Sequence, residues 1–467
     1  MQKQSSPFLY RCIRAVMKLA LAVFFQRIEL RNGKFVPARG PVVFVANHPN
    51  SIMDALVMGV VTRRKVNYLG HAGLFSNRLK TWFLRSSGVI PVYRKEDAPD
   101  KMQQNLTAFE ACYQALENGE AIGIFPEGTS DMQRKVKRLK TGAARIILEA
   151  ERRNNYQLQI TCLPIGLYFF SRSRFRSKVL VNVGKPIRMK KFYELNKTDN
   201  AEAVLQLTAE IQNKLERLTV NIRHEELDLF VRDVEILFRD ELKKAAPELS
   251  RSVKSSLTDF VITQRIAECV EYYYQHDPEK VRSLQDKINV YKRKLKKLHL
   301  KDAMLKEKQS FTRVLKSSLR TFGTALPGFP LAFYGLLNNF IPYYISEIIA
   351  KRFTDDRTKI LSALLIGGGC AFAFFYSLQG FFVWYFKGVF WAWLYLISLP
   401  ISGLFALAHI KSVRAQQERL SFSFFIFTNK QLFSRMRRER RRLIREMYRI
   451  KDEYLKIMER RATGIST

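Results

Sequence analysis

The chain has 467 residues, enough for one domain with extensions or for two domains. Its formal net charge of +37 predicts a polyanionic partner or surface, either nucleic acid or anionic lipid. Much of the phenylalanine, 35 residues in all, lies in long apolar runs, which favours lipid, and no recognised basic-aromatic module supports nucleic-acid binding. The five cysteines are scattered without metal-ligand spacing, which predicts free thiols in a reducing compartment rather than a disulfide framework.

Residues 1–30 are predicted to form a helix that lies in the membrane interface. Arg11, Arg14 and Lys18 share one face of this helix, and apolar residues fill the rest of its surface. A secretory signal peptide is the competing interpretation, but no small-residue cleavage site follows Phe25. We therefore expect a cytoplasmic start.

Residues 31–220 are predicted to form an α/β domain, in which a mixed sheet is covered by helices. Apolar segments that alternate with helical ones predict the strands, and this rhythm is typical of parallel or mixed sheets. The predicted strands are 42–45, 66–69, 89–93, 121–125, 159–167 and 179–183, and the most evident helices are 100–118 and 141–152.

Residues 221–320 are predicted to form an all-helical extension. It contains a cationic cluster, Lys292, Arg293, Lys294, Lys296 and Lys297, for which a solvated helix face and lipid-headgroup contact are equally good interpretations. Residues 321–350 are apolar but interrupted by three prolines. This segment is expected to be re-entrant or interfacial, although a third membrane span stays open.

Residues 360–410 are predicted to form a transmembrane helical hairpin. No charged residue lies between Lys359 and Lys387, or between Lys387 and Lys411. At about 1.5 Å per residue, each run is long enough for a hydrocarbon core of about 30 Å. Basic residues flank both ends, so both ends are expected on the cytoplasmic side, with a tight turn at 385–388 outside. Residues 411–467 then form a basic tail helix near the cytoplasmic leaflet.

The most informative stretch is the turn that follows the first predicted strand of the domain. His48 is followed by Asp54, and neutral imidazole is the side chain best tuned to act as a base near pH 7. A carboxylate on the far ring nitrogen holds the required tautomer and stabilises the imidazolium that forms. The pair therefore indicates a base that activates a hydroxyl group.

Two further turns carry side chains suited to a phosphorylated alcohol. Arg94 follows a strand and offers a bidentate fork for phosphate. Glu127 can hydrogen-bond a polyol hydroxyl, and Gly128 lets the backbone approach a ligand closely. A basic set that could complete an anion site for acceptor phosphate or donor phosphopantetheine precedes the next helix: Arg134, Lys135, Lys137, Arg138 and Lys140. A solvated or membrane-facing surface is the alternative for that set.

Four motifs in order resemble those of the glycerophosphate acyltransferases, over roughly residues 25 to 220. They are Asn47-His48…Asp54, Gly88…Arg94, Phe125-Pro126-Glu127-Gly128-Thr129-Ser130 and Leu163-Pro164-Ile165-Gly166. The resemblance implies the glycerophosphate acyltransferase fold and acyl transfer from a thioester without a covalent acyl-enzyme. It implies that His48 is the base and Asp54 its orienter. The substrate-binding residues expected with them are Asn50, Arg94, Glu127, Gly128, Thr129, Ser130 and Lys140.

Two departures indicate the branch of the family. Five residues separate His48 from Asp54, where bacterial lysophosphatidate enzymes have four, and Ser130-Asp131 replaces the usual arginine after the Glu-Gly-Thr motif. Both features are similar to yeast-type glycerol-3-phosphate/dihydroxyacetone-phosphate acyltransferases, whose first motif also has an asparagine at the place of Asn50. The expected acceptor is therefore glycerol-3-phosphate or dihydroxyacetone phosphate.

The expected protein is an integral membrane enzyme with its catalytic domain on the cytoplasmic side. Its expected partners are membrane lipids, the acyl donor (acyl-CoA or acyl carrier protein) and the phosphorylated acceptor, with no nucleic acid, no metal and no cofactor. Two alternatives stay open. One is a lysophosphatidate acyltransferase, and the other is a non-catalytic lipid-binding membrane protein, which the intact His48 and Asp54 disfavour.

Overall fold

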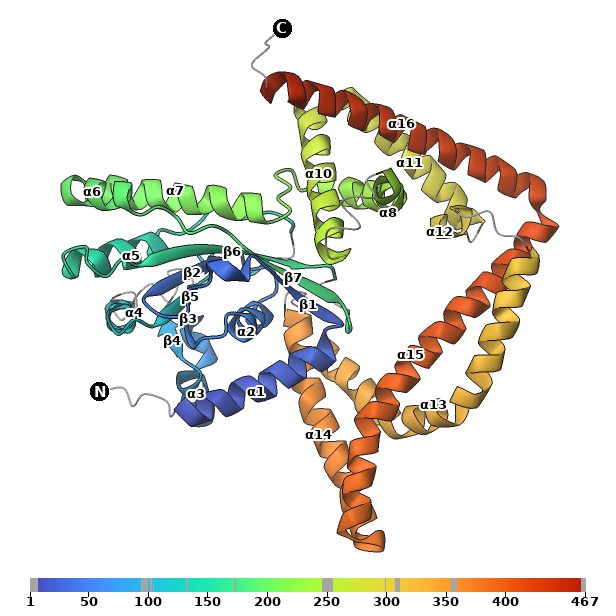
Figure 1. Cartoon of the computed structure of the whole chain (residues 1–467), viewed down its shortest axis with the longest axis horizontal. Helices are drawn as coiled ribbons and strands as arrows, with labels where there is room; N and C mark the ends of the chain where they lie inside the picture. The colour runs from blue at the N-terminus through green and yellow to red at the C-terminus, as the bar shows by residue number, and fades with distance from the viewer. Residues whose placement is uncertain are drawn as a thin grey trace. The chain divides into compact units, whose positions relative to one another are not determined.

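The computed structural model describes residues 7–93, 100, 103, 105–131, 133–171, 174–245, 255–298, 300–306, 311–353 and 359–462. The chain divides into two compact units. The first comprises residues 1–228 with the segments 248–267 and 354–365, and the second comprises 229–247, 268–353 and 366–467. Figure 1 shows the elements of both.

The first unit is built on a seven-stranded mixed sheet, with strand order β1-β7-β6-β2-β5-β3-β4. All neighbouring strands are parallel except β6 and β7, which are antiparallel. This confirms the expected mixed sheet covered by helices. The strands are β1 (Arg27–Arg31), β2 (Val42–Ala46), β3 (Val66–His71), β4 (Val89–Val92), β5 (Ala121–Ile124), β6 (Thr161–Phe169) and β7 (Lys178–Val183).

Strand β2 lies in the middle of the sheet, and helices cover both of its faces. Its Val43 and Val45 side chains belong to a core cluster that includes residues of α4 (Asn105–Glu117), α5 (Gly142–Arg153) and α7 (Asn200–Leu218). Val42, Phe44 and Ala46 point the other way, into a cluster with residues of α1 (Pro7–Phe24) and α2 (Ile52–Val61). A continuous apolar run is what a strand buried on both faces requires.

The sequence did not predict the edge strand β1. Its residues, Arg-Ile-Glu-Leu-Arg, alternate charged and apolar side chains and pair in parallel with β7. Such alternation over only five residues is easily taken for a loop, whereas pairing with β7 supplies the backbone hydrogen bonds that make it a strand. The other helices of this unit are α3 (Arg78–Ser86), α6 (Lys190–Thr198) and the first half of α10 (Ser255–His276).

The second unit is helical in the residues described. Ion pairs join α11 (Pro278–Lys297) to α16 (Lys430–Ala462): Lys280–Glu453, Lys287–Glu446 and Lys294–Glu439. Arg440 of α16 is buried and binds Asp302 of α12 (Asp302–Leu305) at 3.0 Å. Of the cationic cluster, Lys294 thus pairs within the unit, and so does Lys292, with Asp233 of α8 (Leu227–Ala245).

Three long apolar helices lie wholly or mostly in this unit: α13 (Phe311–Phe353), α14 (Ile360–Lys387), whose residues up to 365 belong to the first unit, and α15 (Val389–Thr428). Within the part of the chain that the structure describes, Ile360–Lys387 and Val389–Gln417 are long and apolar enough to cross a membrane. The turn between them is Gly388, at a φ of +87°. Such a positive φ is readily adopted only by glycine.

Candidate active site

The site begins where β2 ends and the chain turns into α2. The side chain of His48 is 15% exposed, and its Nδ1 lies 2.9 Å from Oδ2 of Asp54, which is fully buried. Because a carboxylate only accepts hydrogen bonds, Nδ1 carries the proton and donates it, which leaves Nε2 with its lone pair. The geometry therefore provides a base oriented by a carboxylate.

The five-residue separation is closed by a tight turn. The Met53 N–H donates to the carbonyl of Asn50 at 3.2 Å, and Ser51, at φ 51° and ψ −131°, holds the second position of a type II′ turn. The backbone N–H of Asn50 also donates to Oδ2 of Asp54 at 2.7 Å. Glycine is the usual residue at this conformation, so Ser51 is strained, and the strain accompanies the meeting of His48 with Asp54.

Aromatic rings fix the plane of the imidazole. The ring of His48 stacks on that of Phe125, with centroids 4.3 Å apart and an interplanar angle of 16°. Tyr68 of β3 lies nearly parallel to Phe125, at 6.3 Å. These contacts restrict rotation of the imidazole about its side-chain bonds. Phe125 was not predicted to be a site residue, although its position next to Pro126 and Glu127 in the third motif was the available signal.

The side chain of Glu127 contacts the backbone of the same histidine. Its Oε1 accepts a hydrogen bond from the backbone N–H of His48 at 3.0 Å, and the residue is only 6% exposed. Burial raises the pKa of this carboxyl to about 7, although the hydrogen bond from the backbone of His48 opposes the rise. Glu127 thus holds the loop that carries the imidazole.

The loop after β5 gathers most of the remaining predicted residues. Gly128 has a φ of +74°, and an added Cβ would lie 2.9 Å from Cε of Lys140, so a lysine side chain lies against this glycine. Thr129 is exposed, and its hydroxyl lies 3.5 Å from Nζ of Lys137, which also pairs with Asp131 at 2.8 Å. Ser130 lies between them and is half-buried. From the sequence, Lys137 was expected only as one member of the basic set that precedes α5.

The two remaining predicted residues are Asn50 and Arg94. Asn50 is fully buried in the turn before α2, and its side-chain amide has no hydrogen-bond partner among the residues described. Arg94 lies outside the described residues, one position after Tyr93. The position of its guanidinium therefore stays a prediction.

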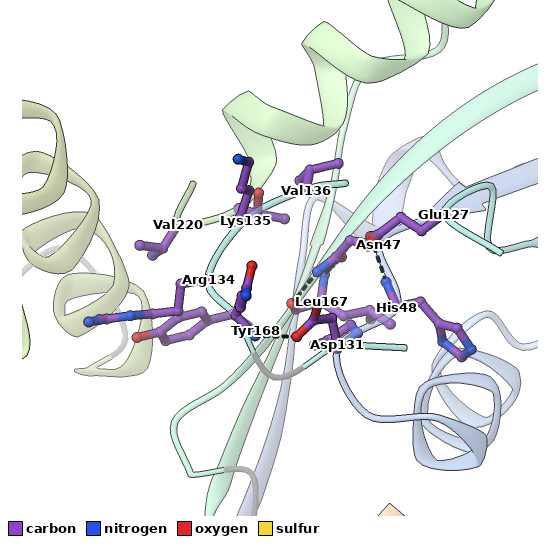
Figure 2. A pocket seen from close by; sticks show the side chains of 13 residues that line it. Asn47, His48, Glu127, Asp131, Arg134, Lys135, Val136, Leu167, Tyr168 and Val220 are labelled. Atoms are coloured by element: carbon purple, nitrogen blue, oxygen red, sulfur yellow. Dashed lines mark hydrogen bonds between the residues drawn. The ribbon is translucent and has the colours of Figure 1, made fainter. Parts of the chain in front are cut away.

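A small pocket adjoins the site (Figure 2). It is lined on one side by Asn47, His48 and Glu127, and elsewhere by Arg134 and Tyr168 among others. The Asn47 amide and the Leu167 backbone exchange two hydrogen bonds, of 3.0 and 2.7 Å, which tie the end of β2 to β6. Figure 2 shows the imidazole of His48 directed away from Arg134 and Tyr168. These two pocket residues therefore lie on the side of His48 opposite to its imidazole.

Comparison with known proteins gives the same assignment as the motifs. Residues 13–168 match the family model described as Acyltransferase. Glycerol-3-phosphate O-acyltransferase 1 of Saccharomyces cerevisiae is 27% identical over 258 residues, which cover 54% of this chain and 32% of that enzyme. Glycerol-3-phosphate O-acyltransferase 2 of the same yeast is 31% identical over 118 residues, covering 25% of this chain and 16% of the relative.

Matches also exist among lysophosphatidate enzymes. A 1-acyl-sn-glycerol-3-phosphate acyltransferase of Bacillus subtilis is 24% identical over 199 residues, covering 41% of this chain and 91% of that protein. A crystal structure of the 1-acyl-sn-glycerophosphate acyltransferase of Thermotoga maritima matches with a TM-score of 0.34 and 18% identity, covering 45% of this chain and 80% of the other. The chain spans only about a third of the first yeast relative that it matches, and less of the second.

Residues 13–168 therefore match an acyltransferase family model, and the chain is similar to glycerol-3-phosphate and 1-acyl-glycerol-3-phosphate acyltransferases. The motif-based resemblance to the yeast-type enzymes is confirmed by the two yeast relatives.

Proposed function

We propose that the chain is a membrane-bound O-acyltransferase that moves a fatty acyl group from an acyl thioester to a hydroxyl of glycerol-3-phosphate or dihydroxyacetone phosphate. The observation that carries this proposal is the 2.9 Å contact between His48 Nδ1 and Asp54 Oδ2 inside an acyltransferase-family domain. Such a contact supports general-base catalysis in a family whose named relatives transfer acyl groups.

In the proposed reaction, Nε2 of His48 removes the proton from the acceptor hydroxyl as its oxygen attacks the thioester carbonyl. Asp54 stabilises the imidazolium that results. The tetrahedral intermediate then collapses to the ester and expels the thiolate, which takes up the proton held by His48. The donor is acyl-CoA or acyl carrier protein, and the reaction as written requires no metal or cofactor.

The loop after β5 is the proposed place for the acceptor phosphate. Lys140 lies beside Gly128 and Lys137 lies beside Thr129, so two lysines flank neighbouring positions of one loop. Phosphate favours a combination of cations and backbone N–H groups. Ser130, Asn50 and Arg94 are proposed to complete the set, and Glu127 is proposed to contact the acceptor with the carboxyl oxygen that does not bind the His48 N–H.

The second candidate is a lysophosphatidate acyltransferase. It is favoured by the Bacillus subtilis relative, nearly all of whose length is matched by this chain. The two residue patterns that separate the branches, the five residues between His48 and Asp54 and the Ser130-Asp131 pair, favour the glycerol-3-phosphate reaction. A non-catalytic lipid-binding role would leave the ordered pair of His48 and Asp54 without a purpose.

We propose a membrane location with the catalytic domain on the cytoplasmic side. Two helices of spanning length support it. Helix α1 supports it too: its outward face presents exposed Val16 (60%), Leu19 (68%) and Val23 (40%), with the exposed cation Lys18 beside them. Apolar side chains flanked by cations are typical of helices that lie in the interface of an anionic bilayer.

The test is acyl transfer by the purified full chain in lipid nanodiscs. Labelled acyl-CoA and acyl carrier protein are supplied in parallel with glycerol-3-phosphate, dihydroxyacetone phosphate or lysophosphatidate. Turnover with either of the first two acceptors is expected to exceed turnover with lysophosphatidate. His48→Ala is expected to abolish it, whereas His276→Ala, at an exposed position on α10, keeps it. Turnover that survives His48→Ala would overturn the mechanism, and a preference for lysophosphatidate would select the second candidate.

A further inference from the structure

Helix α13 is apolar but does not have the simple geometry of a spanning helix. No charged residue occurs from Thr321 to Ser346. Large side chains along this part are exposed, including Leu326 (63%), Leu337 (66%) and Phe340 (56%). Three prolines, Pro327, Pro330 and Pro342, lie inside the helix. Apolar surface of this extent requires lipid or protein to cover it.

The first part of α13 runs antiparallel to α15. Gly328 packs against Phe405 and His409, whereas Gly335, further along, packs against the backbone of Ser402. Further again, the Asn339 amide donates to the carbonyl of Leu399. Residue numbers on α15 therefore fall as those on α13 rise.

The last part of α13 runs antiparallel to α14. Nε2 of Gln379 donates to the carbonyl of Asn338 at 3.1 Å. Later in α13, Ser346 lies against Gly368, and Ile349 lies against Gly367. Residue numbers on α14 therefore also fall as those on α13 rise.

Helices α14 and α15 themselves run in opposite directions, because Gly388 joins them and Gly380 packs against Leu396. A straight helix cannot be antiparallel to both. The direction of α13 must therefore reverse near Asn338 and Asn339, and Figure 1 shows it curving from α15 toward α14.

Pro342 supplies the chemical reason for the bend. It has no N–H, so the carbonyl of Asn338, four residues earlier, loses its helical partner. Gln379 donates to that same carbonyl. In a bilayer core no water can hydrogen-bond an unpaired carbonyl, so this side chain makes the bend compatible with a membrane.

Tyrosine hydroxyls satisfy the two asparagine side chains at the bend. Tyr395 donates to Oδ1 of Asn338 and Tyr376 donates to Oδ1 of Asn339, each at 2.6 Å. Asn339 is 9% exposed. Polar groups held in pairs within an apolar region are typical of contacts between membrane helices.

We infer that α13 is a re-entrant helix, which enters the membrane and returns to the same side, with Asn338 and Asn339 at its deepest point. Residues 395 to 411 of α15 span roughly 24 Å at 1.5 Å per residue, so the bend lies deep in a hydrocarbon core of about 30 Å. The ion pair between Asp302, before α13, and Arg440, after α15, supports the inference. It places both ends of the membrane segment on one side, which requires an even number of crossings.

Single-cysteine labelling of the full chain tests the topology. In a background in which exposed Cys12 and Cys370 are replaced and no labelling remains, Leu319→Cys and Arg352→Cys report the two ends of α13. Lys456→Cys on α16 and Lys387→Cys at the hairpin turn are the references for the two sides. With a membrane-impermeant maleimide on sealed vesicles, both ends of α13 should label together with position 456. Labelling of positions 319 and 352 from opposite sides would overturn the inference.

A double-mutant cycle tests the cause of the bend. Gln379→Leu should lower the melting temperature of the full chain in detergent by a few degrees, because the Asn338 carbonyl loses its donor. Pro342→Ala restores an N–H four residues after that carbonyl, so Gln379→Leu should cost little in the Pro342→Ala background. An equal cost of Gln379→Leu in both backgrounds would show that this side chain does not serve the bend.

Discussion

The buried carboxyl of Glu127 is expected to make the stability of the fold depend on pH, by an amount that follows from its raised pKa. Burial raises the pKa of its carboxyl from 4.5 to about 7, a difference of about 2.5 pH units. At about 1.4 kcal/mol per unit, ionising it in the folded protein costs about 3 kcal/mol more than in the unfolded chain. The direction of the change in stability with pH follows from the number of protons that each state holds. Between pH 4.5 and 7 the folded state holds a proton that the unfolded state has lost, so this group makes stability fall as pH rises through that window.

The perturbation is Glu127→Gln, which removes the charge and keeps an oxygen that can accept from the His48 N–H. The difference in unfolding free energy between the wild type and the variant is measured from pH 4 to 8. The wild type should lose about 3 kcal/mol relative to the variant between pH 4.5 and 7, and little more above pH 8. Subtracting the unfolding free energy of the variant from that of the wild type removes the contributions of all other titrating groups.

Thermal unfolding of the full chain in detergent, followed by intrinsic fluorescence, is a suitable assay. For a unit of this size, the expected change corresponds to a relative shift of roughly 6–10 °C in melting temperature. Glu225→Gln, at an exposed position of the same unit, is the matched control and should show no such trend. A difference between wild type and Glu127→Gln that does not vary with pH would refute the reasoning.

Three further substitutions probe the turn, the base and the loop. Asp54→Asn should lower kcat by on the order of 10³–10⁴-fold with little change in KM, because an amide no longer stabilises the His48 imidazolium; steady-state kinetics decide, and an unchanged kcat would contradict the role. Ser51→Gly should raise stability by about 1 kcal/mol at unchanged kcat, since glycine adopts this turn without strain; denaturation that shows a loss would speak against it. Gly128→Ala should raise the KM for the phosphorylated acceptor several-fold, because its Cβ would meet Lys140 and φ is positive; an unaltered KM would argue against a phosphate site there.

The local pattern of the chain was sufficient for much of the fold. Strand β2 was predictable because five consecutive apolar residues suit a strand buried on both faces. The two apolar helices α14 and α15 were predictable because each comes from a run without charge that is long enough for a membrane span. Strand β1 was missed, because its five residues alternate charged and apolar side chains and only pairing with β7 makes them a strand.

The candidate site also has features that could be predicted from the sequence and features that could not. Residue types and spacing within the chain were enough to predict that His48, Asp54, Glu127 and Gly128 belong to one site, and the structure places Asp54 and Glu127 in contact with His48. Only the tertiary structure decided how His48 meets Asp54 across a longer turn, through the conformation of Ser51. It also decided that Glu127 binds the backbone of His48, because that contact joins the ends of two strands that are far apart in sequence.

Helix α13 shows most directly why some features could be predicted from the sequence and others could not. The sequence of α13 determined that it is apolar and that prolines weaken its helix, since these are properties of the residues themselves. Which proline bends the helix depends on a partner for the freed carbonyl, and the partner of Asn338 is Gln379 of another helix. Composition and periodicity are local and can be read along the chain, whereas a hydrogen bond between distant residues exists only once the chain has folded.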